Sequence, residues 1–173
     1  MGKFHAKKQI YDNIQFDSIT EKNYYIYLKD LMKKGQVTEI ICHPVYLLQE
    51  KYIIHEGKII FSSNDNFEKI RRKYKCKTYQ EITYAPDFVV TYKDKHIEAV
   101  DVKGKETDVF RIKEKLFNFR YPELELVVVK YDLKTNKFYN IKEYKQLIKD
   151  RKKEKTSKEE KKKVKAKSRT KKK

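Results

Sequence analysis

The 173-residue chain has no tryptophan, four glycines, three prolines and two cysteines. It contains no P-loop, no GxGxxG dinucleotide motif and no nucleophile elbow, which excludes the common glycine-dependent sites for nucleotides and acyl transfer. Cys42 and Cys76 form neither a CxxC pair nor a disulfide framework, which fits a reducing compartment. No run approaches the ~18 apolar residues of a transmembrane helix, and no signal-peptide core follows the start. We therefore expect a cytoplasmic protein without a membrane partner.

Positive charge is what the chain has in excess. It holds 43 Lys and Arg residues against 25 Asp and Glu residues, a formal net charge of +18. Residues 151–173 carry +11 of this excess, and residues 1–150 carry the remaining +7. A like-charged block with few apolar residues cannot offset its ordering entropy, so we predict one domain over 1–150 and a disordered or fraying helical tail over 151–173. Counterion release favours nucleic acid as the partner, and solubility is the alternative.

The pattern of apolar residues predicts an α/β fold, bordering on α+β, with a mixed central sheet flanked by helices. Ser18-Ile-Thr-Glu21 is a capping box that begins a helix, and Gly35 marks its end. The segment 67–77 is basic and fits neither periodicity. The expected elements are an extended segment over 9–16, a helix over 18–34, strands over 38–42, 45–49, 51–54, 58–61, 80–91 and 95–102, a helix over 108–119, a strand over 124–130, and a last helix from Ile141.

Two aspartates stand out on neighbouring strands. Asp87 follows Pro86, and Asp101 ends the next strand two residues before Lys103. A turn centred on Asp94 places Asp87 directly opposite Asp101, where two carboxylates repel each other. A divalent cation would relieve that repulsion, because Mg²⁺ binds one or two carboxylates and completes its shell with water and phosphate oxygens. The alternative is that both are ordinary strand acids that face solvent.

Glu21 is a further candidate carboxylate. Its helix face continues through Tyr25 and Leu28, so it lies at one end of the face that packs inward. As the third helical residue of the capping box it also has a structural role, and a metal would compete with the cap for its oxygens. From the residues alone, the cap is the favoured role.

The motifs around Asp87 and Asp101 resemble those of the PD-(D/E)XK nuclease superfamily, because Asp101-x-Lys103 follows Pro86-Asp87 with the right spacing. Over about residues 9–130, the chain is similar to small phage-encoded endonucleases related to Holliday-junction-resolving enzymes and to nuclease subunits of transposases. His43 stands where these relatives more often have Gln. The matching segments are Phe16-Asp17-Ser18-x-x-Glu21, Tyr25, Leu28-Lys29, Gly35, the strand from His43 to Leu48, Pro86-Asp87-Phe88, Asp101-Val102-Lys103-Gly104, and Arg111-Ile-Lys113 running to Tyr121-Pro122.

This resemblance implies a restriction-endonuclease-like core and a metal-dependent endonuclease that cuts DNA. Asp87, Asp101 and Glu21 would then hold Mg²⁺ or Mn²⁺, with Glu21 acting directly or through water. Lys103 would orient or activate the attacking water, or neutralise charge in the transition state. Branched DNA, such as a Holliday junction, is the substrate that the relatives suggest. Symmetric cuts across a junction would need a homodimer, and a phage enzyme would work in the host cytoplasm.

Three polar residues of the helix over 108–119 are candidates for contact with the DNA backbone. They lie opposite the apolar stripe that we expect to face the core. A solvated helix face explains them equally well. The three residues are Arg111, Lys115 and Asn118, and the stripe consists of Val109, Ile112 and Leu116.

The four histidines show no metal-ligand spacing such as His-x-x-x-His. We expect His5, His43, His55 and His96 to be structural or surface residues.

Two other functions stay open. In the first, the chain is a non-catalytic, basic nucleic-acid-binding protein, and its acids have no catalytic role. In the second, it is a nuclease subunit that needs a partner protein. Cleavage that depends on a divalent metal separates the nuclease from the first alternative, and activity of the isolated chain separates it from the second.

Overall fold

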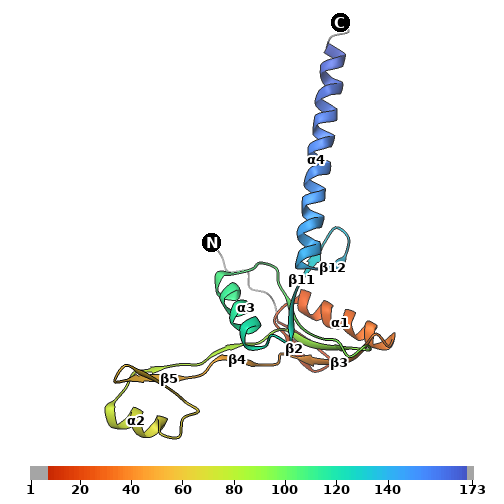
Figure 1. Ribbon diagram of the computed structural model, residues 1–173. Coiled ribbons are helices and arrows are strands. Elements are labelled where there is room, and N and C mark those ends of the chain that lie inside the picture. The colour runs from red at the N-terminus through yellow and green to blue at the C-terminus, as the bar shows by residue number, and fades with distance from the viewer. Residues whose placement is uncertain (1–7, 171–173) are drawn as a thin grey trace. The chain divides into compact units, whose positions relative to one another are not determined.

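The computed structural model describes residues 8–170, with side chains for residues 8–159 (Figure 1). None of the helices in this part of the chain is long and apolar enough to cross a membrane. The helices are α1 (Ile19–Lys33), α2 (Phe67–Tyr74), α3 (Asp108–Arg120) and α4 (Ile141–Thr170). The strands are β1 (Gln9–Tyr11), β2 (Ile14–Phe16), β3 (Val37–Cys42), β4 (Tyr46–Gln49), β5 (Tyr52–His55), β6 (Lys58–Phe61), β7 (Thr78–Tyr79), β8 (Ile82–Tyr84), β9 (Phe88–Tyr92), β10 (Ile97–Val102), β11 (Glu125–Asp132) and β12 (Lys137–Asn140).

The chain divides into two compact units, Met1–Val127 and Val128–Lys173. The largest sheet has the strand order β12-β11-β10-β9-β3, and β11 runs from the first unit into the second. This sheet is mixed, although its pairs β3–β9, β9–β10 and β11–β12 are antiparallel. The predicted α/β class with a mixed sheet is confirmed. The boundary between these two units lies within β11.

Helix α1 begins and ends as its sequence predicts. The Ser18 hydroxyl accepts a hydrogen bond from the backbone N–H of Glu21, which fixes the first turn. At the other end Gly35 adopts a φ of +71°, and it donates to the Met32 carbonyl while Gln36 donates to the Leu31 carbonyl. This pair of bonds is a Schellman motif, which needs a left-handed residue at the position of Gly35.

The predicted strand over 80–91 is wrong, since the structure divides it. Ile82–Tyr84 pairs with β4, whereas Phe88–Tyr92 pairs with β3 and β10. The break falls at Ala85–Asp87, where Pro86 has no N–H to donate to a ladder. Beyond the break the register is the predicted one, because Val100 lies opposite Phe88 and Ile97 opposite Thr91.

The paired strands β4 and β8 lead away from the large sheet to a smaller sheet of order β6-β5-β7, on which α2 packs (Figure 1). The strands predicted over 51–54 and 58–61 are confirmed as β5 and β6, which pair as a hairpin around Glu56-Gly57. The segment 67–77, which sequence periodicity left unassigned, forms α2 and the residues after it. We call residues 51–79 the arm.

Aromatic side chains fill the space between α1 and the strands β2, β9 and β10. Phe16, Leu28 and Phe88 are fully buried, and Tyr24 and Tyr25 are nearly so. The rings of Phe16 and Tyr25 lie 5.2 Å apart, and Tyr24 lies 5.8 Å from Phe88. Tilted aromatic pairs at such distances contribute beyond their buried area. The predicted inward stripe of this helix is therefore confirmed.

The predicted inward face of α3 is wrong. Val109 and Ile112, which we expected in the core, are 64% and 60% exposed, and the buried residues are Phe110 and Phe117. Phe117 packs edge-on against Tyr46 at 5.1 Å and Tyr84 at 5.6 Å. Phenylalanines bury more area than Val and Ile do, so the aromatic contacts set the rotation of the helix.

The second unit contains a hairpin, β11–β12, and the long helix α4. Asn140 and Glu143 cap the helix reciprocally, with N···O distances of 2.9 and 3.2 Å. The guanidinium of Arg151 donates to both carboxylate oxygens of Asp132, at 2.6 and 2.8 Å, and Thr135 donates twice to the same carboxylate. This fork holds the helix on the hairpin ten residues after the helix begins.

The backbone of residues 151–170 is helical, which is the second of the two forms, disordered or fraying helix, that the sequence predicts for the tail. Lys, Glu, Arg and Ala, which dominate this segment, are good helix formers, and the Arg151–Asp132 fork anchors its first turn. Residues 171–173 lie outside the described part of the chain.

We predict that Arg151→Gln lowers the melting temperature by a few degrees and reduces the helical circular dichroism signal. The change leaves the buried Asp132 carboxylate without its cation. Because Arg151 holds the pKa of Asp132 well below its usual range, the stability of the pair is present above about pH 4 and is lost as the pH falls below that value. The difference between variant and wild type should therefore shrink in acid.

Lys153→Gln removes the same charge from an exposed position two residues along, and it serves as the control. Equal melting temperatures for the two variants would contradict the anchoring role of the fork.

Candidate functional site

Asp101 is the most deeply buried acid of the first unit. It lies near the end of β10 with no exposed surface. The Tyr84 hydroxyl donates to its Oδ2, and burial together with the Asp101 charge raises the pKa of Tyr84, so the phenol keeps its proton. Lys103 Nζ lies 2.8 Å from Oδ1, an ion pair whose angle is outside hydrogen-bond geometry, so that oxygen accepts no hydrogen bond. The Lys103 ammonium also lies 5.4 Å from the Phe110 ring.

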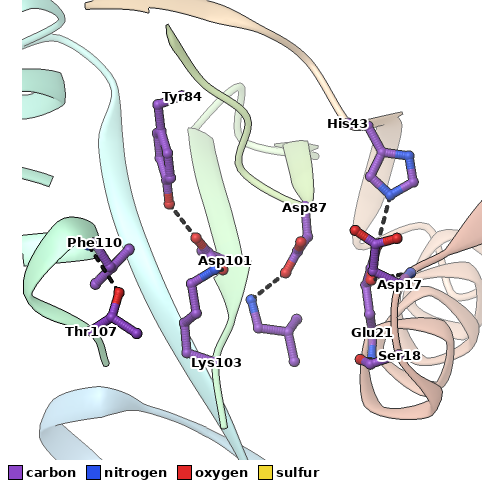
Figure 2. A network of polar contacts seen from close by, with 11 residues as sticks. Asp17, Ser18, Glu21, His43, Tyr84, Asp87, Asp101, Lys103, Thr107 and Phe110 are labelled. Atoms are coloured by element: carbon purple, nitrogen blue, oxygen red, sulfur yellow. Dashed lines mark hydrogen bonds and ion pairs between the residues drawn. The ribbon is translucent and has the colours of Figure 1, made fainter. Parts of the chain in front are cut away.

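Asp87 lies beside Asp101, as the register predicts (Figure 2). Its Oδ2 accepts a 2.6 Å hydrogen bond from the backbone N–H of Val102, the residue that follows Asp101. Burial and then the charge of Asp101 raise the pKa of Asp87 to about 8, against the stabilising effect of the Val102 N–H. The structure thus brings together the two aspartates that the sequence singled out.

The two carboxylates form a donor set that fits a divalent cation. Asp101 is buried and Asp87 is half-buried, they repel each other, and Asp101 Oδ1 accepts no hydrogen bond although the Lys103 ammonium lies beside it as an ion-pair partner. Two such carboxylates are what Mg²⁺ or Mn²⁺ takes from a protein, with water and phosphate oxygens completing the shell. Asp87 and Asp101 would therefore hold the ion, with Lys103 beside them.

Glu21 combines its predicted cap with a second contact. The side chain is buried, and its Oε2 accepts a 2.8 Å hydrogen bond from the backbone N–H of Asp17, one residue before the N-cap. Its Oε1 lies 2.6 Å from Nε2 of His43. The structural role that we favoured from the residues alone is present. The cap uses one oxygen, and the other faces the imidazole.

His43 is a site residue that the sequence analysis missed. It has a φ of +52°, uncommon for a residue with a side chain, and its backbone N–H donates to the Asp87 carbonyl at 2.9 Å. The same residue thus contacts Glu21 through its ring and Asp87 through its backbone. Its place before Pro44 at the end of an apolar strand was the available signal, but the left-handed backbone that turns the ring towards α1 follows from no local pattern.

The three predicted carboxylate ligands do not all converge. Among the described residues, the group of three side chains whose ligand atoms lie within 4.8 Å of one another is His96, Glu98 and Glu125. That group is partly exposed, and its Glu98 carboxylate already accepts hydrogen bonds from Tyr92 and His96. Glu21 acts on Asp87 through its charge, which also raises the pKa of that carboxyl. Of the two roles proposed for Glu21, contact through water fits this separation.

The three polar residues of α3 proposed to contact DNA are exposed. Arg111 lies 3.7 Å from Asp108 and 4.0 Å from Glu106, so acids on its own surface partly neutralise it. Lys115 and Asn118 face solvent on the same helix. Both explanations, backbone contact and a solvated face, fit this placement.

Comparison with known proteins identifies one family. Its model matches residues 1–138 and is described as a protein of unknown function, DUF1064. No curated protein matches the chain significantly. No solved structure does so either.

We predict that Asp87→Asn stabilises the metal-free protein at alkaline pH. The folded pKa of about 8 lies above the unfolded value of about 3.9, so the folded state binds more protons and wild-type stability falls as the pH rises between these values. Melting temperatures in EDTA should be equal near pH 4 and higher for the variant by about 3 °C or more at pH 8, which corresponds to roughly 1 kcal/mol.

Glu81→Gln, which changes an exposed acid of the same unit, is the control. A melting-temperature difference between Asp87→Asn and wild type that is the same at every pH would contradict the raised pKa.

Proposed function

Since the chain belongs to the DUF1064 family, whose function is unknown, we propose its function from its own site: Mg²⁺- or Mn²⁺-dependent hydrolysis of phosphodiester bonds in DNA. The observation that carries the proposal is the pair formed by the half-buried Asp87 and the buried Asp101 beside Lys103. A chain with a net charge of +18 keeps these two acids together, where a phosphate would need a cation to approach them.

Each residue of the site has a role in this chemistry. Asp87 and Asp101 hold the ion, which when bound polarises the phosphate and lowers the pKa of a coordinated water. Lys103, about one-third exposed and paired with Asp101, reaches towards solvent, where it orients the attacking water or donates to a phosphate oxygen. The Tyr84 hydroxyl fixes the orientation of the Asp101 carboxylate. Glu21 and His43 position the side of the site formed by Asp87.

The order of elements supports the nuclease proposal. Helix α1, the strands β3, β9 and β10, helix α3 and strand β11 follow one another as helix, three strands, helix and strand. This is the order that the resemblance to PD-(D/E)XK nucleases implies, with the arm inserted between β3 and β9. We propose a restriction-endonuclease-like core on this basis, and an enzyme that works in the cytoplasm, that of the host if the chain is phage-encoded.

The preference for branched DNA is proposed from the resemblance alone. Symmetric cleavage of a four-way junction would need two active sites related by a two-fold axis, and hence a homodimer. Equal rates of cleavage on linear duplex and on a four-way junction would contradict the preference for branched DNA. They would not affect the proposal that the chain hydrolyses DNA.

We predict that Asp87→Ala, Asp101→Ala and Lys103→Ala each reduce cleavage of DNA by at least about 100-fold. The aspartate variants lose ligands of the ion, and the lysine variant loses the group that meets the water or the phosphate. The measurement is the rate of cleavage of linear, flap and four-way-junction DNA by the purified chain in Mg²⁺, Mn²⁺ or EDTA.

Lys105→Ala removes an equal charge from an exposed residue two positions beyond Lys103, and it should cut at the wild-type rate. Wild-type activity of the three site variants would overturn the proposal. DNA binding without cleavage in any divalent metal would favour the non-catalytic alternative, and cleavage that appears only with an added protein would favour the subunit alternative.

We also predict that removal of residues 156–173 weakens DNA binding without changing the chemistry. The truncation retains the Arg151–Asp132 fork and removes a net charge of +8. The affinity for duplex DNA should fall by about tenfold or more, and its dependence on salt should become shallower. The rate of hydrolysis at saturating DNA should stay the same, and a loss of that rate would contradict this division of roles.

A further inference from the structure

The arm, residues 51–79, is a small body with its own core at the end of the β4–β8 ribbon (Figure 1). Ile53 is fully buried, and Phe67 is 2% exposed where α2 packs on β5. Tyr52 and Tyr79 stack across the β5–β7 pair with their ring centroids 4.7 Å apart. This internal packing closes the arm on itself, so its surface is available for a partner.

The arm is basic beyond what its own acids neutralise. It has eight Lys and Arg residues and three acids, a net of +5. Among the acids, Glu68 is paired with Arg71 at 2.7 Å and approached by Arg72 at 3.5 Å. The four lysines that follow from α2 onwards are all exposed, and they lie within nine residues of one another. They are Lys69, Lys73, Lys75 and Lys77.

The geometry of these lysines favours a fixed anionic ligand. Lys73 lies over the Tyr74 ring at 4.9 Å, and Lys77 lies over the Tyr79 ring at 5.0 Å, so their ammonium groups are held against aromatic faces. Lys75, the C-cap of α2, has a φ of +50°, a position where glycine is usual and a side chain costs about 1–2 kcal/mol. Favourable helix-dipole interactions account for cations in the last turn, but not for lysines that continue to residue 77.

The base of the arm is braced against the candidate site. Tyr84, the last residue of β8, donates to Asp101, and two residues separate it from Asp87. The Tyr121 hydroxyl donates to the Leu47 carbonyl of β4 at 3.0 Å, and Tyr46 packs on Phe117. Thr78 to Asp87 spans at most about 30 Å of chain. The Thr78 end of the arm therefore lies no more than about 30 Å from Asp87. One bound DNA duplex is long enough to contact both.

We propose that the arm is a DNA-binding element that grips the phosphate backbone of the same duplex within about 30 Å of the bond being cut. Exposed lysines bind phosphates as point charges and do not distinguish one base from another. The arm thus sets where the duplex lies relative to Asp87 and Asp101. This inference rests on the proposed function in taking DNA as the substrate, and it adds the surface that binds it.

The test compares two variants of the full chain with the same net charge. The arm variant carries Lys69→Gln, Lys73→Gln, Lys75→Gln and Lys77→Gln. The control carries Lys33→Gln, Lys34→Gln, Lys93→Gln and Lys95→Gln, four exposed lysines that follow the ends of α1 and β9 and lie outside the arm. Both sets include one residue with positive φ, Lys75 or Lys95, so the backbone strain is matched.

Binding of a 30-base-pair duplex is measured in EDTA, so that cleavage does not enter the result. We expect the arm variant to bind at least about tenfold more weakly than the control, with a salt slope smaller by about 3. Hydrolysis of bis(p-nitrophenyl) phosphate in Mn²⁺, a diester too small to reach the arm, should be the same for both variants. Equal affinities would overturn the proposal and leave the exposed Ile54–Ile59 face of the arm as a surface for a protein.

A second measurement uses the unaltered chain and requires no variant to fold. DNA should protect Lys73, Lys75 and Lys77 from acetylation and leave Lys93 and Lys95 reactive, and the opposite pattern would contradict the proposal. If the chain binds DNA through the arm but cuts nothing, the proposed nuclease activity is refuted and the proposed role of the arm stands. A chain that cuts DNA while the arm variant binds normally would refute the arm alone.

Discussion

The pairing of β9 with β10 is the constraint on which the candidate site depends. Its register ends with Val100 opposite Phe88, and Asp101 and Asp87 are the neighbours of these two residues along the chain, just beyond that last pair. The Val102 N–H then donates to the Asp87 side chain where a further ladder bond would have formed. Two carboxylates are thereby held together at the buried edge of a sheet, and neither can turn to water without breaking a hydrogen bond of its own.

This arrangement is costly in the absence of a cation, and the surrounding structure is built to maintain it. The aromatic core of Phe16, Tyr24, Tyr25 and Phe88 fixes α1 against the strands, and Tyr84 and Lys103 hold Asp101 from two sides. His43 ties the backbone of Asp87 to Glu21. Unfavourable arrangements such as this carboxylate repulsion persist where the surrounding packing fixes the residues in place. They are concentrated at functional sites.

The positive charge of the chain has separate places and separate roles. The basic end of α4 carries charge along a helix that the Arg151–Asp132 fork anchors at its start. The arm carries its lysines on a closed body that the braced β4–β8 ribbon joins to the large sheet. A solvated helix attracts a polyanion from any direction, whereas lysines held against aromatic rings favour one path for it. Under the proposed function, both elements would contribute to the affinity for DNA, and the arm would also set where the duplex lies.

The sequence by itself determined the elements whose signals are local. Ser18, Glu21 and Gly35 bound α1 through hydrogen bonds within a few residues, and the turn at Asp94 sets the register that pairs Asp87 with Asp101. Tertiary structure decided the rest. Phe110 and Phe117 occupy the inward face of α3 because their aromatic partners lie on β4 and β8, and Arg151 anchors α4 on the hairpin by reaching Asp132. His43 entered the site through a left-handed backbone and two distant partners. Such contacts join residues far apart in the chain, so no periodicity or spacing records them.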